Sequence, residues 1–200
     1  EVAKGFEAPF ISGKDSLYNE SPLGPVTPTL LITAVGIIPD VRKAVTIDLK
    51  QPGDSIYLVG QTLPELGGSE YYRLKGFVGK TVPRVEVRQA KKIVDSIVKA
   101  VDAGYVRACH DLSEGGLAVT AAEMALASDH GVDMWLKRVP RPKGLARNDF
   151  ILFSESNSRF LVEVEEKRQS DFEGMLKGVP FGLVGRVRKD HCFTIYDVKD

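Results

Sequence analysis

The segment Ser12–Ser16, with the sequence SGKDS, carries residue types that bind phosphate groups and divalent cations. Gly13 would let the backbone approach a phosphate closely, and Lys14 would neutralise its charge. Asp15 could bind Mg²⁺ through an oxygen, and the hydroxyl of Ser16 could bind a phosphate or substrate oxygen. The spacing of a Walker A loop is absent, so an ordinary polar turn is the alternative.

A second polar segment, His110–Leu117 (HDLSEGGL), lies between a predicted strand and a predicted helix. Ligands favour this position because the amides at a helix N-terminus attract anions. Asp111 and Ser113 could bind such a ligand or could only cap the helix. Capping does not explain the adjacent Gly115 and Gly116, which cost helix stability and indicate close approach of another backbone or a ligand. The histidine could act as a general base, although a lone histidine in a loop is more often structural.

A third polar segment, Phe153–Phe160 (FSESNSRF), leads into a predicted strand. Its hydroxyls and single carboxylate, on Ser154, Glu155 and Ser156, could contact a polar ligand. Taken alone, the segment is typical of an ordinary polar turn.

The elements that must position these segments follow from hydrophobic periodicity. The clearest is a helix over 86–101, whose apolar residues recur at a spacing of three to four and which ends near Gly104. The segment 60–73 reads as a glycine-bearing loop. Further helices are predicted over 116–128 and within 165–178. One strand is predicted over 27–38 and a second, short strand that ends near Lys50. Six more strands are predicted, over 55–60, 105–109, 131–136, 158–164, 181–187 and 192–198. This alternation predicts an α/β or α+β sandwich in which helices cover one or both faces of a sheet.

Composition narrows the class of protein. Lys and Arg together number 27 and so do Asp and Glu, so charge gives no reason to expect nucleic acid or an anionic membrane as the main partner. No apolar run approaches the ~20 residues of a membrane span. The two cysteines, Cys109 and Cys192, are far apart in the sequence, which favours a reduced, cytoplasmic protein. A domain boundary is predicted at the turn near Pro52, because the preceding residues are too few to fold alone.

Four stretches in this order resemble the phosphoribosylformylglycinamidine synthase family, and more narrowly its synthetase subunit: PFISGKDSLYNE, PTLLITAVGIIPDV, HDLSEGGLAVTAAEMA and LFSESNSRFLVEV. The resemblance implies an α+β fold, with a mixed sheet covered by helices, like the C-terminal domain of aminoimidazole ribonucleotide (AIR) synthetase. It also implies that residues 1–50 are the tail of the second ATP-binding domain and that residues 51–200 form the last companion domain. The chain would then be a C-terminal fragment, inactive alone.

The family's reaction, as the resemblance implies it, is ATP-dependent amidation of formylglycinamide ribonucleotide. It uses Mg²⁺, ammonia released from glutamine by a glutaminase subunit, and a small bridging subunit. No catalytic residue of the family matches this chain. By resemblance, the expected nucleotide-binding residues are Gly13, Lys14, Asp111, Ser113, Gly115 and Gly116, and the expected substrate-binding residues are Ser16, Ser154, Glu155 and Ser156. Lys14 stands where many relatives have a Mg²⁺-binding Asn, which leaves Asp15 as the candidate metal ligand.

Other interpretations stay open at this point. The loops could form the active site or a pseudo-symmetric, non-catalytic nucleotide site, or the domain could be a scaffold that fixes the geometry of its neighbours. The chain could also belong to another member of the superfamily, such as thiamine-phosphate kinase, selenide water dikinase or the hydrogenase-maturation enzyme. Strands before Lys50 that lack their partners would favour a homodimer.

Overall fold

A mixed six-stranded sheet of order β4-β6-β3-β7-β5-β8 forms the centre of the protein. The structure is a computed structural model that describes residues 1–15 and 19–198. Neighbouring strands pair antiparallel except β5 and β8, which pair in parallel. The strands are β3 (Ser55–Val59), β4 (Val106–Asp111), β5 (Gly131–Trp135), β6 (Phe160–Val164), β7 (Phe181–Arg188) and β8 (Phe193–Tyr196).

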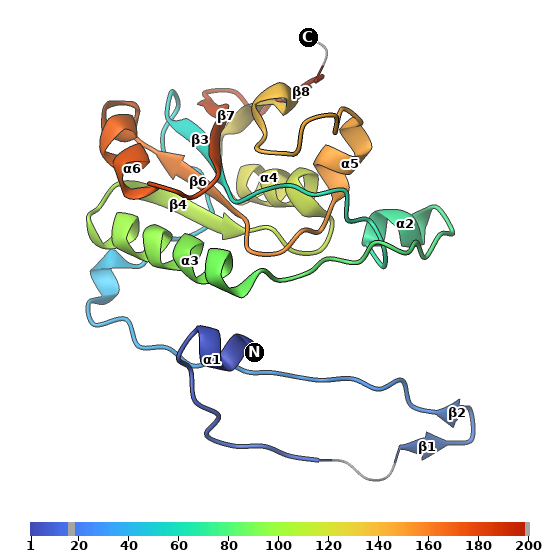
Figure 1. Cartoon of the computed structure of the whole chain (residues 1–200). Coiled ribbons are helices and arrows are strands. Elements are labelled where there is room, and N and C mark those ends of the chain that lie inside the picture. The colour runs from blue at the N-terminus through green and yellow to red at the C-terminus, as the bar shows by residue number, and fades with distance from the viewer. Residues whose placement is uncertain (16–18, 199–200) are drawn as a thin grey trace.

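Helices cover both faces of this sheet (Figure 1). On one face lie α3 (Val87–Asp102) and α6 (Gln169–Met175), and on the other lie α4 (Gly116–Leu126) and α5 (Asn148–Phe153). The central strand β3 alternates between the two cores, since Ile56 and Leu58 pack with α4 whereas Tyr57 and Val59 pack with α3 and α6. Each fully buried side chain of this kind stabilises the fold by about 1.5–3 kcal/mol. The predicted sandwich with a mixed, helix-covered sheet is confirmed.

Most of the predicted elements are confirmed within one to three residues. The helix predicted over 86–101 is α3, and Gly104 lies just beyond it with a positive φ of 73°. The strand predicted over 158–164 begins at Phe160 and is buried on both faces rather than half-buried, because helices lie on both sides of the sheet. No helix in the described ranges is both long and apolar enough to cross a membrane.

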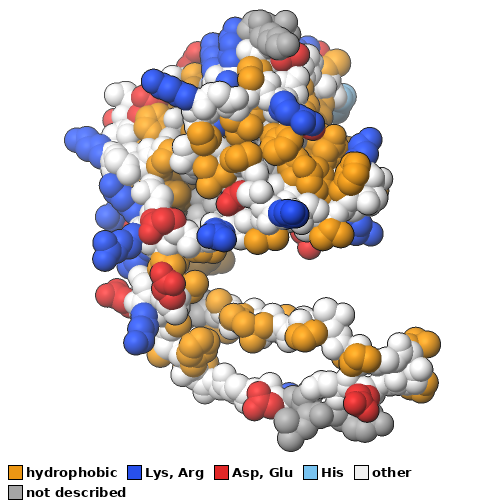
Figure 2. All heavy atoms as spheres, turned by 45° about the vertical axis from the view of Figure 1, so that its right-hand side comes forward, with side chains coloured by type: hydrophobic (Ala, Val, Ile, Leu, Met, Phe, Trp, Pro, Cys, Tyr) orange, Lys and Arg blue, Asp and Glu red, His pale blue; other side chains and the backbone are white. Residues whose placement is uncertain are grey.

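The strand predicted over 27–38 is wrong. These residues have no regular secondary structure and belong to an N-terminal arm (described residues 6–15 and 19–40) that extends away from the sheet (Figure 1). Leu30 is 84% exposed and Ile37 91% exposed, and Figure 2 shows hydrophobic side chains exposed along the arm. An apolar, β-branched run forms a strand only where another strand pairs with it, and the described residues offer none. Helix α1 (Val2–Gly5) precedes the arm. The arm itself contains two short strands, β1 (Glu20–Ser21) and β2 (Gly24–Pro25).

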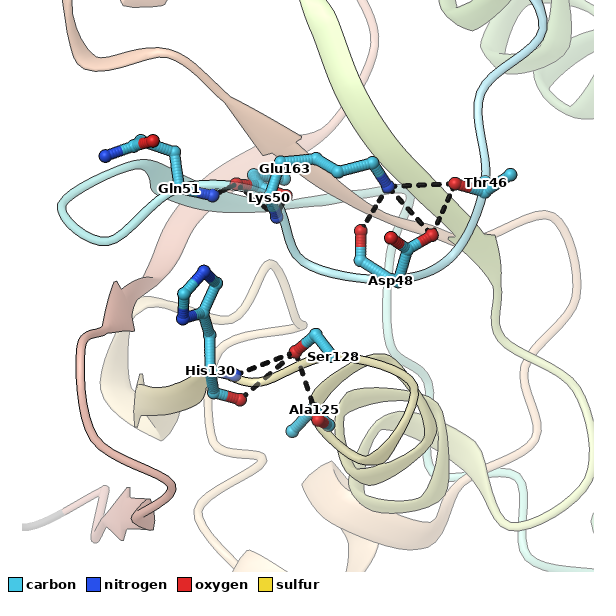
Figure 3. Close-up of polar contacts among 8 residues, drawn as sticks. All are labelled: Thr46, Asp48, Lys50, Gln51, Ala125, Ser128, His130 and Glu163. Carbon is cyan, nitrogen blue, oxygen red and sulfur yellow. Dashed lines mark hydrogen bonds and ion pairs between the residues drawn. The ribbon is translucent and has the colours of Figure 1, made fainter.

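The strand predicted to end near Lys50 is also wrong. In its place are the 3₁₀ helix η1 (Val41–Lys43) and an isolated bridge between Thr46 and Ala108. Beyond the bridge, the carboxylate of the buried Glu163 on β6 accepts hydrogen bonds from the backbone amides of Lys50 and Gln51, at 2.8 and 2.9 Å (Figure 3). The buried side chain of Glu163 therefore holds the backbone at residues 50–51, where pairing with another strand was expected.

Two short helices were not predicted from the sequence. Helix α2 (Glu70–Leu74), capped by the side chain of Ser69, overlaps the end of the expected 60–73 loop, and α5 ends at Phe153, where the third polar segment begins. Both are too short for periodicity to reveal. The remaining 3₁₀ helices are η2 (Leu136–Arg138) and η3 (Glu166–Arg168), the second of which leads into α6.

Candidate functional site

Two of the three polar segments meet at the start of α4. The backbone amide of Gly115 donates to Oε1 of Glu155 at 2.9 Å, which joins the 110–116 segment to the 153–159 segment. Gly13, Lys14 and Asp15 are exposed and lie on the arm, away from this meeting point (Figure 1). Ser16 lies outside the described residues. The structure therefore brings together the second and third segments, without the first.

Glu155 stabilises two helix N-termini at once. Its Oε1 accepts from the amide of Gly115, ahead of α4, and from the amide of Glu70, the first residue of α2, both at 2.9 Å. Amides at helix starts have no partner within the helix, and the helix dipole favours a negative charge there. A carboxylate of the chain itself thus lies where a ligand anion was expected. The predicted nucleotide-binding role of Gly115 and Gly116 stays a prediction.

A positive φ favours glycine at both adjacent positions, and close approach of another backbone requires it at Gly116. Gly115 has a φ of 78° and Gly116 a φ of 64°. A Cβ on Gly116 would lie 2.4 Å from the carbonyl oxygen of Ser154. The approach of another backbone that this pair predicts is confirmed, and it packs α4 against the end of α5.

The capping interpretation of Asp111 and Ser113 is wrong. The N-cap of α4 is Gly115, and no side chain caps the helix from that position. Asp111 is the last residue of β4, its side chain is 63% exposed, and Ser113 is also exposed. Both side chains lie at the surface beside the start of α4, and their predicted role in nucleotide binding stays a prediction.

His110 lies between two carboxylates. Its Nε2 is 3.0 Å from Oε2 of Glu123 on α4, and its Nδ1 is 3.4 Å from Oδ1 of Asp111. The residue belongs to β4 rather than to the predicted loop. A partly buried imidazole held on both sides packs the strand against α4.

Ser154 and Ser156 are buried, and their hydroxyl groups bond within the protein. Ser154 Oγ donates to the carbonyl of Leu63 at 2.6 Å and lies 3.0 Å from Ser156 Oγ. Ser156 Oγ accepts from the amide of Leu63 at 3.0 Å. These bonds hold the 62–66 loop against the 153–159 segment. The substrate-binding role expected for Ser154, Glu155 and Ser156 stays a prediction.

Arg159 completes this network and was not identified from the sequence. The residue is 1% exposed, and its guanidinium donates to the carbonyls of Ser156 and Ser154 at 2.8 and 2.5 Å and to Thr62 Oγ1 at 2.9 Å. Burial lowers the pKa of Arg159 to about 10, although the nearby carboxylates of Glu65 and Glu155 act to raise it. A single Arg in a polar segment gives no sequence signal of burial, since most arginines are exposed.

Metal binding has little support in the described residues. Within residues 1–15 and 19–198, no three His, Cys, Asp or Glu side chains gather as metal ligands. Asp15 is exposed on the arm. Its expected role as a Mg²⁺ ligand stays a prediction.

The sequence pattern of the family described as AIR synthase related protein, C-terminal domain, matches residues 51–198. The chain belongs to this family. The match begins beside the predicted domain boundary, and the AIR synthase related C-terminal domain accounts for the whole six-stranded sheet and its helices.

Two curated relatives of the chain carry the same name. It is 46% identical over 165 residues to phosphoribosylformylglycinamidine synthase subunit PurL from Methanothrix thermoacetophila, a match that covers 82% of this chain and 21% of that protein. It is 37% identical over 200 residues to the same subunit from Thermococcus sibiricus, covering 100% of this chain and 28% of that protein. The chain thus spans between a fifth and a third of the length of these relatives.

Solved structures share the fold. Thermotoga maritima PurL complexed with FGAR matches with a TM-score of 0.69 at 20% identity, over 78% of this chain and 27% of that one. The same protein complexed with ATP matches with a TM-score of 0.66 at 21% identity, over 80% and 26%. The hydrogenase maturation protein HypE of E. coli matches with a TM-score of 0.58 at 17% identity, over 76% and 49%. At these identities the likeness shows the fold alone.

Proposed function

We propose that the chain is part of a phosphoribosylformylglycinamidine synthase, an enzyme that amidates formylglycinamide ribonucleotide with ATP and glutamine-derived ammonia in purine biosynthesis. One observation carries the proposal: the 46% identity to a PurL subunit across 82% of the chain. The matches to HypE and to a thiamine-monophosphate kinase, at 17% and 15% identity, reflect the shared fold and give these alternatives less support.

The cofactors and partners follow from this proposal. ATP with Mg²⁺ would activate the substrate on the whole enzyme, and a glutaminase subunit and a small bridging subunit would supply ammonia. Support comes from Thermotoga maritima PurL, which has been solved in complexes with ATP and with FGAR. A cytoplasmic location suits such an enzyme. The 200 residues would contribute a companion domain rather than the catalytic residues.

Residues 1–50 are proposed to be the tail of an ATP-binding domain that precedes the family domain. The arm supports this view, because Leu30, Leu31 and Ile37 are each more than four-fifths exposed. Apolar side chains in such a run are usually buried against a partner. A second strand-forming segment of the same enzyme would supply that partner and convert 27–38 into the strand that its composition favours.

A scaffold role is the second candidate, and the third polar segment favours it. Ser154, Glu155, Ser156 and Arg159 all bond within the protein, so they hold loops and helix starts in place. The domain would then fix the geometry of neighbouring domains and make no contact with substrate.

The experiment that tests the proposal is an amidation assay on the complete protein that carries these residues. With formylglycinamide ribonucleotide, ATP, Mg²⁺ and ammonium chloride, we expect ADP release that depends on the ribonucleotide. ADP release that depends on thiamine monophosphate instead would overturn the proposal. Glu155→Gln separates the two roles of the third segment: substrate binding predicts a raised KM in a folded enzyme, whereas a scaffold role predicts lost stability with an unchanged KM.

A further inference from the structure

A pocket of about 470 Å³ lies beside α2, apart from the start of α4. Its volume is in the range of small-molecule sites. In Figure 2, which brings the side of α2 and α5 forward, hydrophobic side chains gather on this side of the molecule with Lys and Arg among them. The lining residues are Tyr71, Tyr72, Lys75, Phe77, Val78, Gly79, Arg147 and Asp149.

Aromatic rings form the wall of the pocket. The ring of Tyr71 stacks on Phe153 of α5, with centroids 4.7 Å apart and an angle of 1° between the planes. Tyr72 meets Phe77 edge-on at 5.9 Å. Phe77 is nevertheless 64% exposed. A large exposed aromatic side chain beside two partly buried tyrosines offers surface on which a flat ring could stack.

Positive charge lies at the same pocket. Lys75 has its Nζ 5.9 Å from the ring centre of Tyr71 and, in the described part of the chain, no ion pair. The guanidinium of Arg147 forms two hydrogen bonds with Asp149, at 3.0 and 2.6 Å, and its side chain is 71% exposed. Asp149 balances one of the two cations, so the lining carries a net positive charge suited to an anionic group.

Helix α2 is held firmly enough to present these groups in one arrangement. Ser69 Oγ accepts from the amide of Tyr72, and Glu155 accepts from the amide of Glu70. A Cβ on Gly79 would lie 2.7 Å from the ring of Tyr72, so the loop after α2 returns directly onto that ring. Preorganisation of this kind lowers the entropic cost of binding.

We propose that this pocket binds a mononucleotide, with the base stacked on the exposed ring of Phe77 beside Tyr72 and the phosphate group at Lys75 and Arg147. The ligand class follows from the pairing of an exposed aromatic ring with an excess of positive charge. Base stacking on aromatic side chains contributes about 1–3 kcal/mol. The proposed mononucleotide binding does not depend on the proposed amidation activity.

The test is calorimetric titration of the 200-residue chain with AMP, and separately with adenosine and with inorganic phosphate. We expect saturable binding of AMP and weaker binding of adenosine. The variants Lys75→Met and Phe77→Ser should each bind AMP about tenfold more weakly, which corresponds to about 1.4 kcal/mol in binding free energy. Both side chains are exposed, so the variants should fold, which far-UV circular dichroism checks. Lys99→Met on α3 removes the same charge outside the pocket and should bind AMP like the unaltered chain.

Three results would overturn the proposal. They are a folded chain that does not bind AMP, phosphate alone binding as tightly as AMP, and equal losses in Lys75→Met and Lys99→Met. The last two would indicate a general attraction for anions. Failure of this test leaves the amidation assay unaffected, because that assay measures turnover by the complete protein.

Discussion

Replacing Glu163 with Gln should remove most of the pH dependence of stability between pH 5 and pH 8. Glu163 is fully buried on β6 and accepts from the amides of Lys50 and Gln51. Burial, together with a smaller effect of the neighbouring Asp54, raises the pKa of its carboxyl from 4.5 to about 7, and the hydrogen bonds from the two backbone amides act in the opposite direction. The pKa of Asp54 is itself raised by burial, against the attraction of Arg107 at 3.2 Å.

The sign follows from the direction of the shift. Because the folded chain binds this proton more tightly than the unfolded chain, the stabilisation is complete below about pH 4.5 and is lost as the pH rises through about 7. A shift from 4.5 to about 7 corresponds to a change in unfolding free energy on the order of 3 kcal/mol. Glu163→Gln cannot ionise, so its unfolding free energy should change much less over the same range. The amide should also lower stability at pH 5 by about 1–3 kcal/mol, since its NH₂ group accepts no bond from the backbone.

The assay is urea denaturation of both chains at several pH values, with Glu165→Gln as the matched control. Glu165 directly follows Val164, the last residue of β6, and the hydrogen bond from Lys167 lowers its pKa, so its substitution should leave the slope between pH 5 and pH 8 unchanged. The reasoning is refuted if the unaltered chain is equally stable at pH 5 and pH 8, or if Glu163→Gln keeps the full slope.

Three further predictions concern packing and assembly. Gly116→Ala should cost about 3 kcal/mol in thermal or urea unfolding, because its Cβ would meet the Ser154 carbonyl; Gly68→Ala, with a similar φ of 74° and open space, should cost only about 1 kcal/mol, and equal costs would argue against the contact. Arg159→Met should cost about 3 kcal/mol or more in urea, since it leaves Glu65 buried without its cation, and a near-neutral effect would contradict the network. The exposed arm should make the chain self-associate in sedimentation velocity, and deletion of residues 6–40 should leave a monomer; a monomer before deletion would disprove this.

The sheet and its long helix could be predicted because their signals are local. The apolar residues of α3 recur on one helical face, and β3 is a short apolar run bounded by turns. The run at 27–38 carries an equally strong local signal, yet it forms no strand because pairing depends on a partner that the sequence pattern does not reveal. Helices α2 and α5 were missed because contacts distant in sequence stabilise them, such as the stacking of Tyr71 on Phe153.

The sequence identified most of the residues of the candidate site but not the contacts that they make. The pairing of Gly115 with Gly116 indicated a close backbone approach, and the structure shows one against Ser154. The partners of Glu155 could not be predicted, because one amide lies 40 residues before it and the other 85. Arg159 illustrates the same limit: its burial depends on three oxygens that tertiary structure alone brings together.

The central claim, that these residues are an interchangeable part of a phosphoribosylformylglycinamidine synthase, is tested most directly by a chimaera. The matching segment of Methanothrix thermoacetophila PurL, to which the chain is 46% identical, would be replaced by these residues, and amidation of formylglycinamide ribonucleotide would be measured with ATP and ammonium. We expect the chimaera to retain amidation, and Arg159→Met within it to lower both stability and activity. A chimaera that folds and binds ATP but fails to amidate the ribonucleotide would contradict the claim.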